Sequence, residues 1–480
     1  MRIMRKTKIV CTIGPSCRSP KTIKEMIRAG MDVARFNLSH QSAEKCLGDI
    51  EVIRSTSTSL GRPVAIMLDL QGPRIRTGKL THDLPLREGT SITLTAQPIT
   101  LTAQPADSGQ QEQRISVNCP GLTSYLKKGA RILIDNDRIE LIATSISGTE
   151  AHCKVVRGGM LGSNKGVNFP GVSIPLPILG EKDERDLRWG LDHGVDWIAG
   201  SFIRNGDDVS TIKSRISDGG GKAGLVAKIE RREAVESISE IVERSDAVMV
   251  ARGDLGVEIG TEVVPVVQRG VVEQAKRAGK PVIIATQMLR SMVQQPKPTR
   301  AEASDIANAV WSGVDALMLS EETAAGEYPV ESLKTMVSIA EEAESVLDYV
   351  RASKMEWVRP ATSSAICLAA CDIAEALKAN AIVTPTESGY TPMEVSRYRP
   401  HPPIIAITPH EEVVRRLTLS WGVIPLKTRT SKNIDDMLEL AVETPLKEGL
   451  IKSGGLVVIT AGVMVNVPGS TNMIKVHRVD

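Results

Sequence analysis

A lysine and two carboxylates lie at the ends of two neighbouring predicted strands. Lys228 and Glu230 are two residues apart around Ile229, so on a strand their side chains point to the same side. Asp254 follows the next predicted strand, Ala247–Ala251. Two carboxylates with open water positions make a candidate Mg²⁺ site, because Mg²⁺ takes few protein oxygens. A fixed ammonium beside the metal suits a transition state that develops negative charge on oxygen.

Further polar and ionisable side chains follow the other predicted strands. They are Arg35, Asn37, Ser39 and His40 after the second strand, Asp69, Arg74 and Arg76 after the third, Gly253 beside Asp254, Thr286 and Gln287 after the seventh, and Ser320, Glu321 and Glu322 after the eighth. For any one of them, contact with solvent is the simpler explanation. For all of these residues taken together that explanation is weaker, because the loops at the amino-terminal ends of the strands supply no comparable cluster. Arg35, Arg76 and Lys165 are cations suited to phosphate, and Gly253 lets a small substrate approach the backbone.

Eight short apolar runs alternate with helical patterns, which predicts a parallel sheet covered on both faces. The runs are Thr7–Ile13, Asp32–Phe36, Pro63–Leu68, Val195–Ser201, Leu225–Ile229, Ala247–Ala251, Pro281–Ala285 and Asp315–Leu319. Eight such strands favour a closed (β/α)₈ TIM barrel, whose active sites lie at the carboxyl ends of the strands. The alternative is a doubly wound open sheet.

Two regions depart from this alternation. Residues 71–167 are rich in Thr, Ser, Gly and Pro with short alternating strands, which indicates an inserted all-β lid domain on a barrel loop. It contains a tandem duplication of ITLTAQP, at 92–98 and 99–105, which we expect at a hairpin tip because insertions cost little there. Residues 346–480 indicate a C-terminal α/β domain. The barrel then comprises residues 1–70 and 168–345, in an α/β fold overall.

Composition argues against several classes of protein. The 480 residues carry a net charge of +2 and only 3% aromatic residues, which disfavours nucleic-acid binding. No apolar run reaches the roughly 18–20 residues of a transmembrane helix, so we expect no membrane partner. Seven scattered cysteines without a CxxC pair indicate reduced thiols and a cytoplasmic location.

Several longer motifs occur along the chain. They are RKTKIVCTIGPS at 5–16, ARFNLSH at 34–40, LDLQGPRIRTG at 68–78, LGSNKGVNFPG at 161–171, AKIE at 227–230, MVARGDLGVE at 249–258, IATQML at 284–289, PTRAEASDIANAV at 298–310 and SEETAAGEYP at 320–329. With these motifs in this order, the chain resembles the pyruvate kinase family over essentially its whole length. The resemblance implies phosphoryl transfer from phosphoenolpyruvate to ADP, giving pyruvate and ATP in the final step of glycolysis. It also implies a cytoplasmic, allosteric homotetramer that uses Mg²⁺ or Mn²⁺.

The resemblance also implies residue roles. Lys228 would stabilise the enolate oxygen, and Glu230 and Asp254 would hold Mg²⁺. Gly253, Asp254 and Thr286 would seat the carboxylate of pyruvate, with Thr286 near the face where the enolate is protonated. Arg35 would bind the transferred phosphoryl group. The phosphates of the nucleotide would be lined by Asn37, His40, Arg76 and Lys165. The inserted domain would close as a lid that excludes water.

One departure from the family concerns a monovalent cation. K⁺-dependent members usually carry Thr-Lys-Gly-Pro-Glu after the third-strand aspartate, and residues matching Asn37, Ser39 and Asp69 help to bind K⁺. Here Asp69 is followed by Leu-Gln-Gly-Pro-Arg, so Arg74 replaces the acidic residue. A guanidinium could supply the same positive charge, and we therefore expect activity without K⁺. The alternative is that Arg74 points to solvent and K⁺ binds as usual.

A second departure lies in the C-terminal region. Thr386, Ser388 and Thr391 belong to a TESGYT loop that resembles an effector-phosphate loop, and hydroxyls with a glycine turn can form a phosphate nest. Tyr390 occupies a position often held by a basic residue, and 461–472 lack Arg, Lys and Trp. We therefore expect a sugar or nucleotide monophosphate rather than a bisphosphate. No effector at all, with an ordinary turn at this loop, remains the alternative.

Two other classes of protein deserve comparison. A metal-dependent aldolase or lyase would account for Lys228, Glu230 and Asp254, but not for the lid, the two arginines Arg35 and Arg76, or the C-terminal region. A silent sensor that keeps the fold would be expected to have lost one of these site residues, and all are present.

Overall fold

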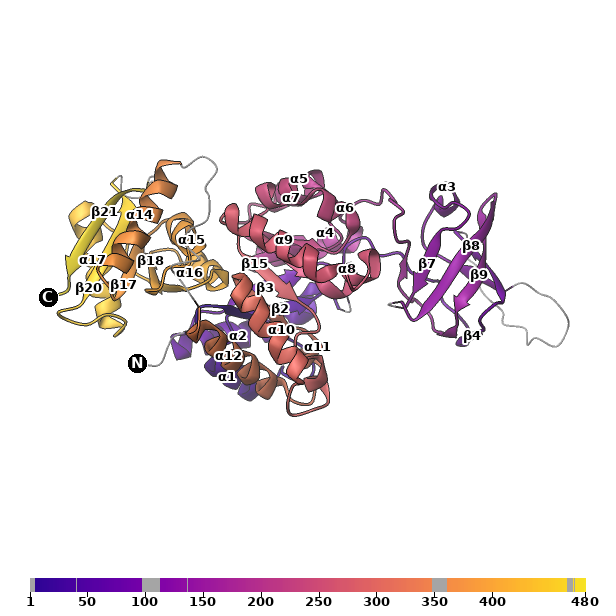
Figure 1. Cartoon of the computed structure of the whole chain (residues 1–480), viewed down its shortest axis with the longest axis horizontal. Coiled ribbons are helices and arrows are strands. Elements are labelled where there is room, and N and C mark those ends of the chain that lie inside the picture. The colour runs from indigo at the N-terminus through magenta and orange to yellow at the C-terminus, as the bar shows by residue number, and fades with distance from the viewer. Residues whose placement is uncertain are drawn as a thin grey trace.

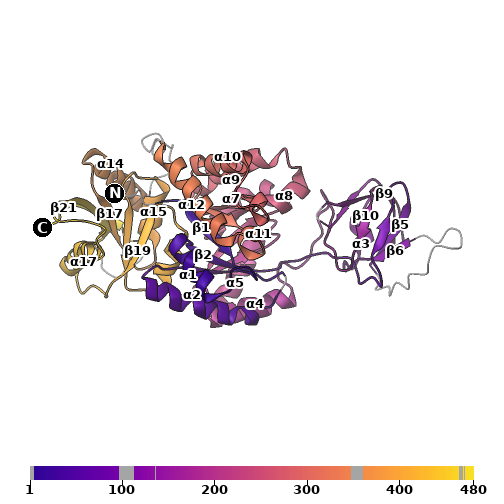
Figure 2. The same cartoon turned by 90° about the horizontal axis from the view of Figure 1, so that it is seen from below.

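The computed structural model describes residues 5–39, 41–96, 113–135, 137–347, 361–463, 469 and 471–480. The chain forms three bodies in a row, with a β/α barrel in the middle, a β-rich body at one end and an α/β body at the other (Figures 1 and 2). The two regions predicted to depart from the barrel pattern, the inserted region and the C-terminal region, thus lie on opposite sides of the barrel (Figures 1 and 2).

Eight parallel strands close into a barrel, which confirms the predicted fold class and excludes the open sheet. The strands are β1 (Lys8–Thr12), β2 (Val33–Asn37), β3 (Ala65–Asp69), β12 (Trp197–Gly200), β13 (Gly224–Ile229), β14 (Ala247–Ala251), β15 (Val282–Ala285) and β16 (Ala316–Leu319). Almost every residue in them is buried, because the helices cover the outside and side chains fill the interior. Each predicted apolar run therefore corresponds to one barrel strand.

The helices around the barrel follow the strands in order. They are α1 (Pro20–Ala29), α2 (Leu47–Leu60), α4 (Glu181–Asp192), α5 (Gly206–Asp218), α6 (Arg232–Glu236), α7 (Ile238–Arg244), α8 (Arg252–Ile259), α9 (Val264–Arg277), α10 (Arg300–Ser312), α11 (Glu321–Ala324) and α12 (Pro329–Ser345), with 3₁₀ turns η1 (Ala43–Cys46) and η2 (Arg290–Val293). Capping residues fix several of their ends. Thr299 and Glu302 form a capping box on α10, and Ser19 accepts the backbone N–H of Thr22 at the start of α1.

The inserted body is built mainly of strands around its own hydrophobic core. Its elements are β4 (Leu84–Leu86), β5 (Ser91–Thr95), β6 (Gln113–Ser116), α3 (Leu122–Tyr125), β7 (Arg131–Ile134), β8 (Ile139–Ser147), β9 (Glu150–Arg157), β10 (Gly159–Leu161) and β11 (Val167–Asn168). The prediction for the duplicated segment is wrong in one respect. Its first copy starts inside β5, which pairs in parallel with β6, so the two strands are not the arms of a hairpin. The second copy, 99–105, lies outside the described residues.

The C-terminal body is a five-stranded sheet with helices. Its elements are α14 (Thr362–Ala376), β17 (Ala381–Pro385), α15 (Tyr390–Arg397), β18 (Ile404–Thr408), α16 (Glu411–Arg416), η3 (Leu417–Leu419), β19 (Val423–Lys427), α17 (Ile434–Lys447), β20 (Leu456–Gly462) and β21 (Thr471–Arg478). The strand order is β19-β18-β17-β20-β21, with only β21 antiparallel. In the part of the chain that the structure describes, no helix is long and apolar enough to cross a membrane.

Candidate active site

Asp69 joins two cations at the carboxyl end of the barrel. It ends β3, and its Oδ2 accepts a hydrogen bond from Arg35 Nε at 2.7 Å. Its Oδ1 lies 3.1 Å from Lys228 Nζ. Arg35 also donates from Nη1 to Thr12 Oγ1 at 2.8 Å, at the end of β1. One buried carboxylate therefore holds the guanidinium and the ammonium in fixed positions.

Lys228 and Glu230 point to the same side of β13, as their spacing predicts. Lys228 Nζ lies 2.8 Å from Glu230 Oε1 and donates to Ser201 Oγ at 2.7 Å. The other oxygen of Glu230 accepts the backbone N–H of Phe202 at 2.7 Å. Lys228 is 8% exposed and Glu230 is 1% exposed, so the ammonium and carboxylate interact in a largely water-free setting.

The charges around Lys228 set the protonation states of this cluster. Burial lowers the pKa of Lys228, but Asp69 and Glu230 outweigh burial and the pKa is raised. For Asp69, burial acts upward, yet Lys228 and Arg35 hold its pKa below the usual range. Lys228 is therefore a cation at neutral pH, and Asp69 is an anion. A cation held here can stabilise negative charge that develops on a substrate oxygen.

Thr286 follows β15 in a left-handed backbone conformation, with φ +72°. Its Oγ1 accepts the backbone N–H of Gly253 at 2.9 Å and donates to the carbonyl of Ala285 at 2.6 Å. A β-branched residue with positive φ is rare and strained, and such strain often occurs at functional sites. A Cβ built on Gly253 would lie 3.5 Å from Thr286 Oγ1, an ordinary contact. Crowding within the chain therefore does not account for this glycine.

Glu230 and Asp254 are the carboxylates that could hold a divalent metal. They come from the adjacent strands β13 and β14, with Asp254 in the first turn of α8. Burial raises the pKa of Glu230, Lys228 opposes this, and the negative charge of Asp254 adds to it. A divalent cation between the two carboxylates would offset this repulsion. Two carboxylates fit Mg²⁺, which takes few protein oxygens and keeps several of its waters.

The predicted nucleotide contacts lie at the barrel end and on the inserted body. Asn37 Oδ1 accepts the backbone N–H of Ser39 at 3.1 Å at the end of β2. Arg76 donates from Nη1 to the carbonyl of Asn164 at 3.1 Å, and burial together with Arg74 lowers the pKa of Arg76. Lys165 Nζ lies 3.1 Å from Asp135 Oδ1. The remaining predicted residue, His40, lies outside the described residues.

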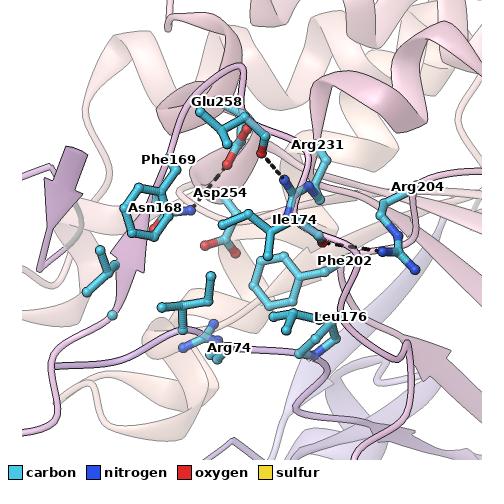
Figure 3. A pocket seen from close by; sticks show the side chains of 15 residues that line it. Arg74, Asn168, Phe169, Ile174, Leu176, Phe202, Arg204, Arg231, Asp254 and Glu258 are labelled. Carbon is cyan, nitrogen blue, oxygen red and sulfur yellow. Dashed lines mark hydrogen bonds between the residues drawn. The ribbon is translucent and has the colours of Figure 1, made fainter. Parts of the chain in front are cut away.

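Arg74 faces a cavity between the barrel and the inserted body rather than open solvent. Its guanidinium lies over the ring of Phe202, 5.5 Å from the centroid. Its Nε is buried and has no hydrogen-bond partner among the residues that the structure describes. The cavity has a volume of about 50 Å³, and Asp254 and Glu258 line it together with Arg74 (Figure 3). Arg74 and the candidate metal carboxylate Asp254 thus line the same cavity.

Three contacts attach the second connection of the inserted body to the barrel. Asn168 donates to Glu258 Oε1 at 3.3 Å (Figure 3). Arg231 Nη2 and Arg204 Nη1 donate to the backbone carbonyls of Val172 and Ile174, at 3.4 and 3.5 Å. These hydrogen bonds are long, so the connection is held by weak contacts.

The predicted effector residues lie around the start of α15. Thr386 Oγ1 accepts the backbone N–H of Gly389 at 3.0 Å. The carbonyl of Ser388 accepts a hydrogen bond from Arg416 at 2.9 Å. Thr391 is buried, and its hydroxyl lies 2.7 Å from Thr471 Oγ1. The loop therefore brings the three residues near one helix start, although the Thr391 hydroxyl already has a partner.

Three residues that organise this site were not predicted from the sequence. Thr12 is the last residue of β1, and Ser201 and Phe202 follow β12; no candidate was named for these two strands. Thr12 and Ser201 orient Arg35 and Lys228, and the backbone of Phe202 holds Glu230. Thr12 and Ser201 lie near the ends of the predicted runs, and reading the polar residues within the last positions of every run would have found the two hydroxyls. Phe202 contributes its backbone N–H, which a φ of +58° directs toward Glu230. A phenylalanine in the sequence gives no indication of such a backbone role.

A barrel with such a cluster of charged side chains is typical of an enzyme that acts on an anionic substrate. The site contains the buried ammonium of Lys228, the guanidinium of Arg35, and two carboxylates, Glu230 and Asp254, that could bind a metal. They lie at the end of the barrel where active sites are found in this fold.

Comparison with known proteins narrows this class. Residues 4–333 match the family model for "Pyruvate kinase, barrel domain", and residues 364–477 match "Pyruvate kinase, alpha/beta domain". The chain is 43% identical to pyruvate kinase 2 of Synechocystis sp., across 99% of this chain and 79% of that protein. It is 42% identical to pyruvate kinase of Clostridium acetobutylicum, across 99% of this chain and all of that protein. A crystal structure of a pyruvate kinase from Cryptosporidium parvum superposes with a TM-score of 0.92 at 34% identity, covering 99% of this chain and 96% of the other.

The chain therefore belongs to the pyruvate kinase family. It is a kinase that transfers a phosphoryl group.

Proposed function

We propose that this enzyme transfers phosphoryl from phosphoenolpyruvate to ADP at the cluster formed by Lys228, Glu230, Asp254 and Arg35, and that it does so without K⁺. The observation that carries the proposal is the buried ion network in which Asp69 holds both Arg35 and Lys228. Family membership supplies phosphoenolpyruvate, ADP, ATP and pyruvate as substrates and products. The network supplies the positive charge that this chemistry needs.

Arg35 and Lys228 have separate roles that follow from their positions. Arg35, fixed by Asp69 and Thr12, binds the transferred phosphoryl group. Lys228, fixed by Ser201 and Glu230, stabilises the oxygen of the enolate as the P–O bond breaks. These groups are positioned before the reaction, so little reorganisation accompanies the transfer.

Glu230 and Asp254 would hold the divalent metal, Mg²⁺ or Mn²⁺. Such a metal would supply positive charge that neutralises the carboxylate and phosphate of the substrate. Gly253 and Asp254 present the backbone at the start of α8 to the carboxylate of pyruvate, and Thr286 Oγ1 fixes Gly253. Thr286 also lies near the face on which the enolate is protonated.

The nucleotide binds between the barrel and the inserted body. Its phosphates contact Asn37, at the end of β2, and His40. They also contact Arg76 and Lys165 on the inserted body. Residues 71–167 act as a lid over the barrel formed by 1–70 and 168–345. The weak contacts at Asn168, Val172 and Ile174 support a lid that moves.

Arg74 replaces the monovalent cation. In K⁺-dependent relatives the residues matching Asn37, Ser39 and Asp69 help to bind K⁺, and an acidic residue stands where this chain has Arg74. The support for the proposal is the guanidinium on the ring of Phe202, in the same cavity as Asp254. An arginine held there carries a permanent charge.

The wider assignment follows the family. The enzyme acts in the cytoplasm in the final step of glycolysis, as a homotetramer. Residues 346–480 form the regulatory domain, and Thr386, Ser388 and Thr391 mark the loop where a phosphorylated effector would bind. The start of α15 supports this location, because the first turn of a helix presents free backbone N–H groups to an anion.

A coupled assay tests the proposed function. Phosphoenolpyruvate, ADP and Mg²⁺ are supplied in an organic-amine buffer free of Na⁺ and K⁺, and pyruvate is measured. We expect full turnover, with less than about a twofold change when KCl is added. A many-fold rise with KCl contradicts the role of Arg74, whereas no turnover with or without KCl contradicts the phosphoryl transfer itself.

A further inference from the structure

Four aspartates tie neighbouring strands together at the N-terminal end of the barrel, opposite the active site. Each directly precedes a strand and accepts the backbone N–H of a residue on the adjacent strand. The pairs are Asp32 with Ile9 at 2.7 Å, Asp196 with Ile66 at 2.8 Å, Asp246 with Leu225 at 2.9 Å and Asp315 with Val282 at 3.0 Å. The carboxylates therefore fix β1 to β2, β3 to β12, β13 to β14, and β15 to β16.

Two of these carboxylates are held from the C-terminal body, Asp315 by Arg399 Nη2 at 2.9 Å and Asp196 by Arg415. Arg415 Nε on α16 donates to Asp196 Oδ1 at 2.7 Å. The other cation nearby, Arg54 of the barrel, lies 3.8 Å from Asp196 Oδ2. Asp196 is 2% exposed, so its charge depends on these two partners. Arg415 makes the closer contact and is the only one of the two with a hydrogen bond to Asp196 among the described residues.

The strands that Asp196 ties together lead directly to the active site. Ile66 is three residues before Asp69 on β3, and Asp196 immediately precedes β12, after which come Ser201 and Phe202. Asp69 and Ser201 contact Lys228, and the N–H of Phe202 contacts Glu230. Short strands in a closed barrel transmit a displacement along their length, because packed interiors deform little.

We propose that Arg415 is a positioning residue for phosphoryl transfer, acting through Asp196. By holding the Asp196 carboxylate, it fixes β3 against β12 and so fixes Lys228, Arg35 and Glu230 relative to one another. The inference rests on the roles proposed above for Lys228 and Arg35. It goes beyond them by assigning part of the geometry of the active site to the C-terminal body.

The helix that carries Arg415 also contacts the loop at the start of α15. Arg416, the next residue, donates to the carbonyl of Ser388 at 2.9 Å. At the other end of α16, His410 Nε2 lies 2.6 Å from Glu387 Oε2. The short helix α16 is thus in contact with both the loop at 386–391 and the strand pair β3/β12.

The position of Arg415 predicts which substrate will be affected. The groups at the ends of β3 and β12 contact the residues assigned to phosphoenolpyruvate. Of the residues assigned to the nucleotide, Arg76 and Lys165 lie on the inserted body, and Asn37 lies on β2, which is outside the strand pair that Asp196 ties. Loss of Arg415 should therefore change kcat and the KM for phosphoenolpyruvate, and leave the KM for ADP near its original value.

The test compares Arg415→Met, which keeps the length of the side chain without its charge, with Arg415→Lys, which keeps a cation. We expect Arg415→Met to lower kcat/KM for phosphoenolpyruvate about tenfold, because a small shift of catalytic groups has effects of this order. The KM for ADP should stay within about twofold, and Arg415→Lys should recover most of the loss. Arg429→Met is the matched control, because Arg429 makes an exposed ion pair with Asp436 in the same body.

Each outcome decides the proposal. Equal kcat/KM values for wild type and a folded Arg415→Met variant overturn it, as does an equal loss for both substrates or an equal loss in the Lys variant. If Arg415→Met does not fold, Arg415→Lys should still show a loss of about twofold for phosphoenolpyruvate alone, and no loss overturns the inference. Lys228→Met, assayed in parallel, separates failure of this inference from failure of the proposed site.

Discussion

The backbone N–H of Phe202 donates to the carboxylate of Glu230 at 2.7 Å. Phe202 has φ +58°, an uncommon conformation for a non-glycine residue, and its ring lies beneath the guanidinium of Arg74. One residue thus connects Arg74, which we propose replaces K⁺, with a carboxylate proposed to bind the metal. Arg74 can therefore influence the site through the position of Glu230 as well as through its charge.

Replacement of Arg74 by glutamate should create a K⁺ requirement. Arg74→Glu restores the acidic residue of K⁺-dependent relatives and removes the fixed cation, so activity in K⁺-free buffer should fall at least about tenfold and return with KCl. Arg74→Lys, which keeps the charge, should remain active without K⁺. The measurement is the steady-state rate against KCl concentration. An Arg74→Glu variant that is fully active without K⁺ would show that the arginine has no such role.

The barrel could be predicted from the sequence because its strands are buried on both faces. Continuous apolar runs such as Ala247–Ala251 became strands, and the alternation of strand and helix specified the closed sheet. The site residues Lys228 and Glu230 followed from the two-residue period of a strand. The apolar content of a segment and the period of its side chains can be read from neighbouring residues, so burial and strand spacing could be predicted without knowing the fold.

Other features depend on contacts that no local pattern contains. Arg415 and Asp196 are 219 positions apart, and nothing near either residue indicates the other. The function of Phe202 lies in its backbone conformation. The duplicated segment was expected at a hairpin tip, but pairing of β5 with β6 in parallel depends on the whole inserted sheet. Long-range pairing and backbone geometry are thus the parts that the sequence did not reveal.

The hydroxyl and the backbone conformation of Thr286 should have separate effects, the first on activity and the second on stability. Thr286→Ala and Thr286→Gly both remove the hydroxyl that holds Gly253, so both should lower kcat about 10²-fold. The glycine variant should be more stable than the alanine variant by about 1 kcal/mol, because only glycine adopts φ +72° without strain. Thr286→Ser keeps the hydroxyl and serves as the control. Equal stability of the Gly and Ala variants in denaturant unfolding would contradict the strain.

Lys276 should make stability depend on pH on the alkaline side. Burial, and then the neighbouring Arg399, lower the pKa of Lys276 to about 8. Between pH 8 and 10.5 the unfolded chain binds more protons at this lysine than the folded protein does, so its contribution to the free energy of unfolding rises with pH. Below pH 8 the buried charge destabilises the fold by about 1–2 kcal/mol, after allowance for its partial exposure to solvent.

Lys276→Met removes this charge and keeps the apolar stem. The variant should melt at a higher temperature than wild type at pH 7, and the difference should vanish near pH 10. Thermal unfolding at both pH values is the measurement, with Lys447→Met at the end of α17 as a control outside this cluster. A lower melting temperature of the Met variant at pH 7 would mean that the ammonium stabilises the fold.

Lys228→Met tests the account most directly. The variant keeps the length of the side chain but removes the cation held by Asp69, Glu230 and Ser201. We predict a loss of at least about 10³-fold in phosphoryl transfer from phosphoenolpyruvate to ADP, with far-ultraviolet circular dichroism unchanged. Turnover within a few-fold of wild type in the folded variant would contradict the assignment of Lys228 as the group that stabilises the enolate.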